Sequence, residues 1–290
     1  MTASRYDDVF EMSDTTEFRL AFQPVVEVEC SAVRIWQALV QDARGQSFEH
    51  LLGTRPIAER NALLRRRTFA VIRASVDAGL LQTEAQLAVP VHAASGGAEE
   101  TATHLLQTAV AHGVPAARLV AEINADECGH VGAAIALAQA CAARGIAVAL
   151  DAFTAGPVGI KLLGGCRPVY LRLAPALVHN LRTSASRVHM MASILRLCRS
   201  MNVRVIAPGI RYAAEAAELY GEGIALMQGE WIAPARVVSL HPLAHADRIH
   251  APRREPRPGL AGLARSDVAA THRRLAHHVR TAPVIIAPMR

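Results

Sequence analysis

The chain has 290 residues, of which 51% are hydrophobic and only 4% are aromatic. This length and apolar content exclude a disordered protein and allow either one barrel-sized domain or two small ones. The formal net charge is +6, but nine arginines against three acids from His245 onward account for all of it. The first 244 residues are therefore close to neutral and lack the basic excess expected of a nucleic-acid-binding barrel.

The number and spacing of the cysteines and the length of the apolar runs indicate the cellular compartment. The five cysteines are odd in number, and none forms a C-x-x-C pair, so we expect small core residues in a reducing environment. No uninterrupted apolar run reaches about 18 residues, and residues 1–17 are polar and acidic. We therefore expect a cytoplasmic protein without a membrane span. The cysteines are Cys30, Cys128, Cys141, Cys166 and Cys198.

After a leader at residues 1–17, the chain opens with two β-rich runs, Arg19–Val28 and Ala32–Val40, spaced as a hairpin. Residues Gly45–Thr54 are polar and predict an irregular connection. A long helical pattern follows at Ile57–Ala78 and ends at Gly79. Its arginine cluster predicts a solvated helix face. The cluster consists of Arg60, Arg65, Arg66 and Arg67.

From there strands and helices alternate regularly. Further strands are predicted at Gln86–Val91, Arg118–Ile123, Ile146–Asp151, Val169–Leu173, Val203–Ala207 and Ala225–Gln228. Helices are predicted at Glu99–His112, Gly132–Arg144, Val158–Leu163, Ser186–Met201 and Ala213–Tyr220. About eight strands with intervening helices predict an α/β protein with a (β/α)8 TIM-like barrel. A doubly wound open sheet is the alternative, but no G-x-G-x-x-G follows the first strand.

We expect the barrel to occupy residues 18–242 and a basic, partly disordered tail to occupy residues 243–290. One helix is predicted at Ser266–Arg280 within this Pro-, Arg- and His-rich tail. Its histidines, His272, His277 and His278, lack a carboxylate or cysteine partner at metal-ligand spacing, so we expect a flexible or partner-binding tail. The apolar end Pro283–Pro288 is either a docking peptide or a disordered terminus.

Asp151 is the first candidate site residue. It ends a short apolar run that begins at Ile146 and predicts a buried parallel strand. The carboxyl ends of barrel strands are where catalytic groups usually lie. The alternative is that Asp151 caps the helix that follows, because Asp is a common N-cap residue.

Seven short motifs lie at the predicted strands. The first four are Phe22-Gln-Pro-Val25, Gln37-Ala-Leu39, Ala121-Glu-Ile-Asn124 and Asp151-Ala-Phe-Thr-Ala-Gly156. The last three are Tyr170-Leu-Arg-Leu-Ala174, Val205-Ile-Ala-Pro-Gly-Ile210 and Met227-Gln-Gly-Glu-Trp-Ile-Ala-Pro234. In this order and spacing they resemble the strand motifs of the EAL domain family, cyclic di-GMP phosphodiesterases built on a (β/α)8 barrel. The resemblance runs from about Phe18 to Pro242.

The departures from the family pattern fall at the residues that hold its two divalent cations. Only Glu122 and Asp151 remain of the expected acids. The family's lysine is Arg172, which stays protonated and is a poor proton acceptor. The other liganding positions carry Gln37, Pro90, Ala152, Ala174 and Pro208. The resemblance therefore implies a remnant site made of Gln37, Glu122, Asp151 and Arg172. We expect this site to contain no catalytic residue and to bind no metal. Magnesium or manganese would be a cofactor only if the site were active.

Gln23, Pro24, Gln228 and Gly229 match positions where the family contacts the nucleotide. They are either candidate cyclic di-GMP contacts or residues kept for barrel structure. The family's phosphate-binding arginine after the signature is Gln41 here, which weakens the phosphate site.

The resemblance leaves three hypotheses. The first is an inactive EAL-like domain that regulates a protein partner in cyclic di-GMP-linked or motility-linked signalling. The second is a receptor that binds cyclic di-GMP without cleaving it, and the third is an active phosphodiesterase. A homodimer through the helices near the fifth and sixth strands is expected by analogy with the family.

Overall fold

The computed structural model describes residues 18–92, 97–125, 131–179, 181, 184–236 and 240. The leader, Cys128 and every expectation for the tail lie outside these residues. The chain divides into two units, Met1–Pro252 and Arg253–Arg290, and the predicted boundary after residue 242 stays a prediction. Among the described residues, no helix is long and apolar enough to cross a membrane.

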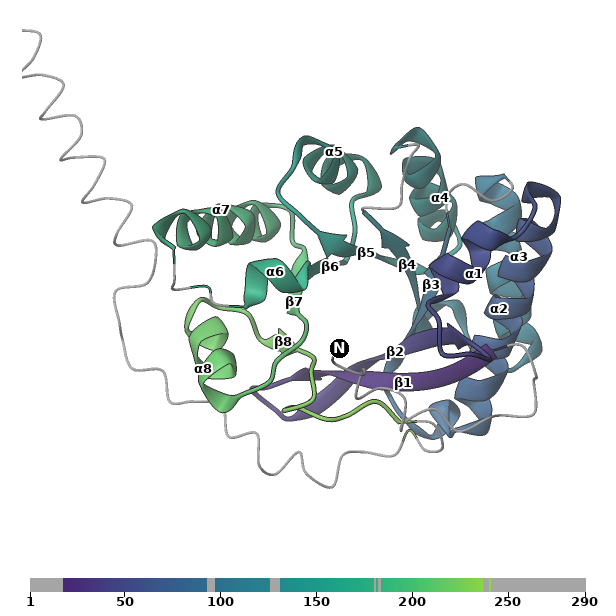
Figure 1. Ribbon diagram of the computed structural model, residues 1–290, viewed down its shortest axis with the longest axis horizontal. Coiled ribbons are helices and arrows are strands. Elements are labelled where there is room, and N and C mark those ends of the chain that lie inside the picture. The colour runs from purple at the N-terminus through teal and green to yellow at the C-terminus, as the bar shows by residue number, and fades with distance from the viewer. Residues whose placement is uncertain are drawn as a thin grey trace, which may run out of the picture. The chain divides into compact units, whose positions relative to one another are not determined.

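Eight strands close into a barrel in chain order, with helices outside the ring of strands (Figure 1). β1 (Phe18–Glu27) runs antiparallel to both of its neighbours, β2 (Ala32–Asp42) and β8 (Leu226–Met227), and the other neighbouring strands are parallel. The TIM-like barrel is thereby confirmed and the doubly wound sheet is excluded. The strands are β1 (Phe18–Glu27), β2 (Ala32–Asp42), β3 (Gln86–Val91), β4 (Leu119–Asn124), β5 (Ala147–Phe153), β6 (Tyr170–Leu173), β7 (Arg204–Ala207) and β8 (Leu226–Met227).

The outer helices include two that the sequence analysis missed, α1 (Phe48–Thr54) and the single-turn α6 (Pro175–Val178). The predicted irregular stretch at residues 45–54 contains α1, because the Ser47 hydroxyl accepts a hydrogen bond from the His50 backbone N–H (3.2 Å) and caps it. The helices are α1 (Phe48–Thr54), α2 (Ile57–Asp77), α3 (Ala98–Ala111), α4 (Val131–Ala143), α5 (Pro157–Cys166), α6 (Pro175–Val178), α7 (Ala185–Ser200) and α8 (Ala213–Gly221), with single 3-10 turns η1 (Leu80–Gln82) and η2 (Ala116–Arg118).

The arginine cluster on α2 is not uniformly solvated. Arg67 is only 3% exposed; its guanidinium lies 4.1 Å above the centre of the Phe48 ring and donates to the Pro90 carbonyl (2.7 Å). Arg65 behaves as predicted and forms an exposed ion pair with Glu100. Arg67 therefore ties α1 and α2 to the carboxyl end of β3, and the prediction of a solvated face is wrong for this residue.

The barrel interior begins with an apolar layer that takes one residue from every strand. Inward-facing residues alternate along each strand, so these eight meet in the lumen. They are Val25, Ile35, Ala88, Val120, Ala149, Tyr170, Ile206 and Leu226. Cys141, Cys166 and Cys198 are buried as predicted, whereas Cys30 is exposed in the turn between β1 and β2.

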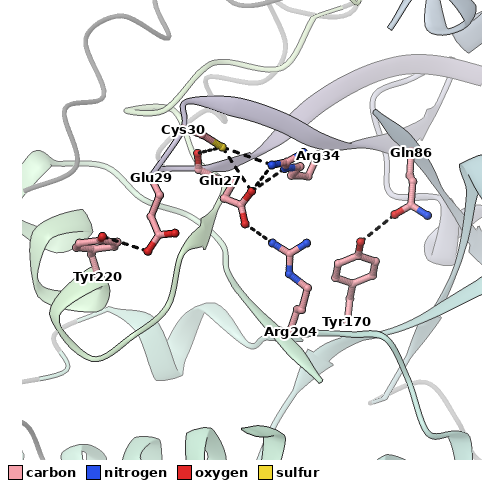
Figure 2. Close-up of polar contacts among 8 residues, drawn as sticks. All are labelled: Glu27, Glu29, Cys30, Arg34, Gln86, Tyr170, Arg204 and Tyr220. Carbon is pink, nitrogen blue, oxygen red and sulfur yellow. Dashed lines mark hydrogen bonds and ion pairs between the residues drawn. The ribbon is translucent and has the colours of Figure 1, made fainter. Parts of the chain in front are cut away.

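The amino-terminal end of the parallel strands carries a polar group that we call the lower cluster, made of Glu27, Arg34 and Arg204 (Figure 2). Glu27 accepts from both arginines, at 2.6 Å from Arg34 and 2.5 Å from Arg204. Tyr170 donates to Gln86 nearby (2.9 Å). Both arginines remain more than 40% exposed, at 46% and 41%. The cluster thus lies at a solvent-accessible surface.

Candidate functional site

A polar layer lies directly above the apolar layer, at the carboxyl end of the parallel strands. Each of its members is two residues along the strand from an apolar-layer residue, so the alternation of the strands places all of them on the lumen side. All are buried except Asp151, which is partly buried. The layer contains Gln23 from β1, Gln37 from β2, Glu122 from β4, Asp151 from β5, Arg172 from β6 and Gln228 immediately after β8.

Arg172 is the centre of this layer. Its Nε donates to Asp151 Oδ1 (2.6 Å), and its Nη2 lies 2.9 Å from Glu122 Oε1. Its Nη1 donates to Gln228 Oε1 (3.1 Å). One planar guanidinium therefore engages both carboxylates and one amide, with directed hydrogen bonds that an ammonium group does not reproduce.

Two glutamines complete the network. Gln228 Nε2 donates to Gln37 Oε1 (2.7 Å), and Gln37 Nε2 donates to Glu122 Oε2 (3.0 Å). The hydrogen bonds thus form a ring through Arg172, Gln228, Gln37 and Glu122. Because a buried polar network is stable when its members are satisfied, this ring favours one closed arrangement of the layer.

Asp151 does not cap a helix. The N-cap of α5 is Gly156, and no side chain caps that helix. Asp151 Oδ1 instead accepts from the backbone N–H of Ala152 (2.6 Å) as well as from Arg172. Ala152 adopts a left-handed backbone (φ 51°), a conformation unusual for a non-glycine residue. The capping alternative is therefore wrong, whereas the interpretation of Asp151 as a site residue stays a prediction.

Burial and the shared guanidinium set the protonation of the two acids. Burial raises the pKa of Glu122 to about 7, with Arg172 pulling it down and the charge of Asp151 pushing it up. Burial would also raise the pKa of Asp151, but the charge and hydrogen bond of Arg172 and the Ala152 N–H lower it below its usual value. Burial opposes the Arg172 charge, yet the two carboxylates raise the pKa of Arg172. Burial and the charge of Asp151 therefore outweigh the pull of Arg172 and raise the pKa of Glu122 into the neutral range.

The four candidate nucleotide-binding residues all have structural contacts. Gln23 Nε2 donates to the Ala233 carbonyl (3.4 Å), and the Gln228 amide belongs to the ring. Pro24 lies opposite Trp36 in the β1–β2 pair. Gly229 has φ 154°, and a Cβ there would lie 2.2 Å from the Ile210 backbone nitrogen. These contacts agree with the structural alternative for all four.

The donor set does not fit the two divalent cations that the family resemblance implies. Pro90, which lies opposite Glu122 in the β3–β4 pair, offers no side-chain donor, and neither do Ala152, Ala174 and Pro208. The two acids already bind Arg172. Within the described ranges, no three His, Cys, Asp or Glu side chains are grouped so that they could hold a metal ion.

The sequence analysis grouped Gln37, Glu122, Asp151 and Arg172, and the structure brings these four together. It missed that Gln228 links Arg172 to Gln37, because it considered this residue only as a nucleotide contact. The signal available was its place two residues after Leu226, on the same side of the closing strand.

The comparisons with known proteins agree with the barrel fold. A model of the EAL domain family matches residues 7–235. The blue light- and temperature-regulated antirepressor BluF of Escherichia coli K12 is 30% identical over 106 residues, which are 37% of this chain and 26% of BluF. The chain thus spans about a quarter of the length of that curated relative.

Two solved structures share the fold at low sequence identity. A standalone EAL protein of Vibrio cholerae O395, bound to cyclic di-GMP, has a TM-score of 0.69 and 22% identity over 78% of this chain and 95% of its own. The FimX EAL domain of Xanthomonas citri, in complex with cyclic di-GMP, has a TM-score of 0.67 and 18% identity over 78% and 91%. With the family match over residues 7–235, the chain belongs to the EAL domain family.

Proposed function

We propose that this chain is a non-catalytic EAL domain that regulates a protein partner by direct contact, in cyclic di-GMP-linked or motility-linked signalling in the cytoplasm. The observation that carries the proposal is the double ion pair of Arg172 with Glu122 and Asp151. The Arg172 guanidinium forms ion pairs with both of the acids that remain at the family's metal-liganding positions.

The chemistry of phosphodiester hydrolysis supports this proposal. Two adjacent dications need several anionic oxygen ligands, and a metal-activated water is the nucleophile in such sites. Here the amide of Gln37 replaces one acid, and proline or alanine replaces others. Arg172 stays protonated at neutral pH, so it cannot accept a proton from water as a lysine could.

The relatives support a regulatory role at a coarser level. BluF is an antirepressor, a protein that relieves repression. The stretch similar to BluF covers 37% of this chain and 26% of BluF. We therefore extend the regulatory role to this protein only as part of the proposal. The partner itself has to be found by experiment.

The test is calorimetric titration of cyclic di-GMP into the full-length protein, with and without Mg2+ or Mn2+, followed by analysis of the mixture for linear product. The proposal predicts no product under any condition. Metal-dependent product formation would overturn it. The Arg172→Lys variant is the matched control, because it shows whether restoring the family's lysine is enough for turnover.

A cyclic di-GMP receptor is the second candidate. It is favoured by the solved relatives that carry this nucleotide, among them the Vibrio cholerae and Xanthomonas citri proteins. A nucleotide reaching Gln228 or Arg172 would have to replace hydrogen bonds of the ring. Saturable, metal-independent binding without product in the same titration would favour the receptor, and binding should then weaken in Gln228→Ala.

A further inference from the structure

A small cavity lies on the outer side of the barrel, between α2, α3 and the carboxyl end of β3, and we call it the α2–α3 cavity. The two helices that enclose it pack side by side (Figure 1). Its volume is about 40 Å3. Since one water molecule occupies about 10–15 Å3 of such space, the cavity has room for about three waters or one small ion. Buried Leu64 and Leu105 form an apolar wall. The charged and imidazole side chains that line it are Arg65, Arg67, His92, Glu100 and His104.

Arg67 brings a buried positive charge to this cavity. The residue is only 3% exposed, and its Nη2 donates to the Pro90 carbonyl (2.7 Å), which fixes the guanidinium at the end of β3. Burial lowers the pKa of His92, and the charge of Arg67 lowers it further. Burial raises the pKa of Glu122, and the charge of Arg67 is among those that pull it down. Groups on both sides of β3 therefore experience the positive field of Arg67.

An ion pair joins the two helices at the cavity. Arg65 of α2 binds Glu100 of α3, and the two side chains are 50% and 60% exposed. The charges of this pair cancel, whereas Arg67 adds a further positive charge to the lining. His104 of α3 lies beside the pair, with Nε2 3.4 Å from the Arg65 carbonyl. The described lining thus combines a net positive charge with two imidazole rings that can form hydrogen bonds.

This lining favours an anion over a metal ion. Its one carboxylate, Glu100, already binds Arg65. In the described ranges, no three His, Cys, Asp or Glu side chains are grouped so that they could hold a metal. The buried charge of Arg67 would also repel a cation at close range. An anion would instead be attracted by the guanidinium and could accept hydrogen bonds from it.

We propose that the α2–α3 cavity binds a small carboxylate, with its charged end toward Arg67 and its carbon end against Leu64 and Leu105. A carboxylate matches a planar guanidinium through paired N–H···O hydrogen bonds. The apolar wall suits a methyl or methylene group, which inorganic phosphate lacks. The same group is present on a free short-chain acid and on an acidic side chain of a protein. This site is separate from the polar layer and does not depend on the proposed function.

The test is a nuclear magnetic resonance titration of the full-length protein, labelled on histidine, with acetate. Sodium chloride keeps the ionic strength constant. We expect the ring signals of His92 and His104 to shift saturably, with a dissociation constant on the order of 1 mM. His189 is the internal control, because it is exposed on α7, across the barrel from α2 and α3 (Figure 1). Its signal should not follow the same curve.

Two charge variants should change the acetate affinity in opposite directions. Arg65→Gln leaves the charge of Glu100 unbalanced beside the cavity and should weaken binding about fivefold, whereas Glu100→Gln removes that charge and should strengthen it. Arg73→Gln is the matched control, since Arg73 and Asp77 form another exposed ion pair of α2, outside the cavity lining. It should change the affinity less than about twofold. These substitutions are at exposed positions and leave the buried Arg67 in place, and circular dichroism verifies that the variants fold.

A second ligand distinguishes the two sources of the carboxylate. Aspartate blocked at both ends as N-acetyl-aspartate N-methylamide presents the group as a protein side chain does. Saturable shifts of His92 and His104 with acetate alone would assign a free short-chain acid as the ligand. The same shifts with both compounds would assign an acidic side chain of a protein. Either pattern supports a carboxylate site.

Three results would overturn the proposal. If the signals of His92 and His104 did not shift saturably up to about 50 mM acetate, the cavity would hold only water. An equal response of Arg65→Gln, Glu100→Gln and Arg73→Gln would show a general ionic effect in place of a site. Tighter binding of inorganic phosphate than of acetate would change the class of ligand.

Discussion

Each end of the barrel holds a cluster of arginine–carboxylate ion pairs, but the numbers of arginines and acids are reversed between the two ends. In the polar layer one arginine, Arg172, serves two acids, Glu122 and Asp151. In the lower cluster one acid, Glu27, serves two arginines, Arg34 and Arg204 (Figure 2). The contacts have similar lengths, but Arg172 is buried and the two lower arginines are open to water. We therefore expect burial, more than contact distance, to decide how much each ion pair contributes to stability.

Burial sets the cost in stability of removing one partner of an ion pair. Removing Arg172 would leave two carboxylates in a water-poor lumen, where an unpaired charge is costly. Removing Glu27 would leave two arginines that water and salt can screen. The two clusters should therefore respond very differently to equivalent substitutions.

The largest effect is expected for Arg172→Met. This change keeps much of the side-chain volume but removes the only cation within hydrogen-bonding distance of both acids in the described lumen. We expect a loss of about 3–5 kcal/mol in the free energy of unfolding at pH 8. The loss should shrink as the pH falls, because the carboxylates take up protons. Chemical denaturation at several pH values measures it, and a loss below about 1 kcal/mol at pH 8 would contradict the account.

The next effect concerns the proton on Glu122. Its folded-state pKa of about 7 lies above the ordinary 4.5, so between these values the folded state holds more protons than the unfolded state. Its contribution to stability therefore falls as the pH rises through this window. The stability advantage of wild type over Glu122→Gln should narrow by about 1–3 kcal/mol between pH 5 and pH 8.

Asp151→Asn is the matched control for that experiment, since the pKa of Asp151 is lowered. The contribution of Asp151 is present above the ordinary pKa of an aspartate and is lost only as the pH falls through the lowered value. Because the charge of Asp151 helps to raise the pKa of Glu122, the difference between wild type and this variant should narrow from pH 5 to pH 8, but by less than it does for Glu122→Gln. If the unfolding free energies of the two variants differed from that of wild type with the same pH dependence, the pKa values of Glu122 and Asp151 would not be shifted in opposite directions as described.

The smallest effect is expected for Glu27→Gln at the lower cluster. Solvent-exposed ion pairs contribute about 0–1 kcal/mol each, so the free energy of unfolding should fall by about 1 kcal/mol or less. Salt should reduce the difference further. Denaturant titrations at low and high ionic strength measure this, and a loss as large as that of Arg172→Met would break the comparison.

Much of the fold could be predicted from the sequence because its signals are local. Strand runs such as Gln86–Val91, separated by helical patterns and by stops such as Gly145, predicted the barrel. α1 was missed because its pattern is short and its capping residue, Ser47, was not considered. The burial of Arg67 could not be seen, because it depends on Phe48 and Pro90 packing against α2.

The candidate site was predictable in its members but not in its bonding. Gln37, Glu122, Asp151 and Arg172 stand at matching strand ends, so a barrel necessarily groups them. The bond between Gln37 and Gln228 joins residues 191 positions apart, and it exists only because β8 closes against β1. Side-chain pairing of this kind follows from barrel closure, which a linear pattern does not contain.

The most direct test of the central claim is a Mn2+ titration of the full-length protein, followed by electron paramagnetic resonance, for wild type and for Arg172→Ala. If Arg172 has taken the place of the metal ions, wild type should bind no Mn2+ at millimolar concentration, whether cyclic di-GMP is present or absent. The variant, with Glu122 and Asp151 released, should gain a weak site. Stoichiometric Mn2+ binding by wild type would contradict the account.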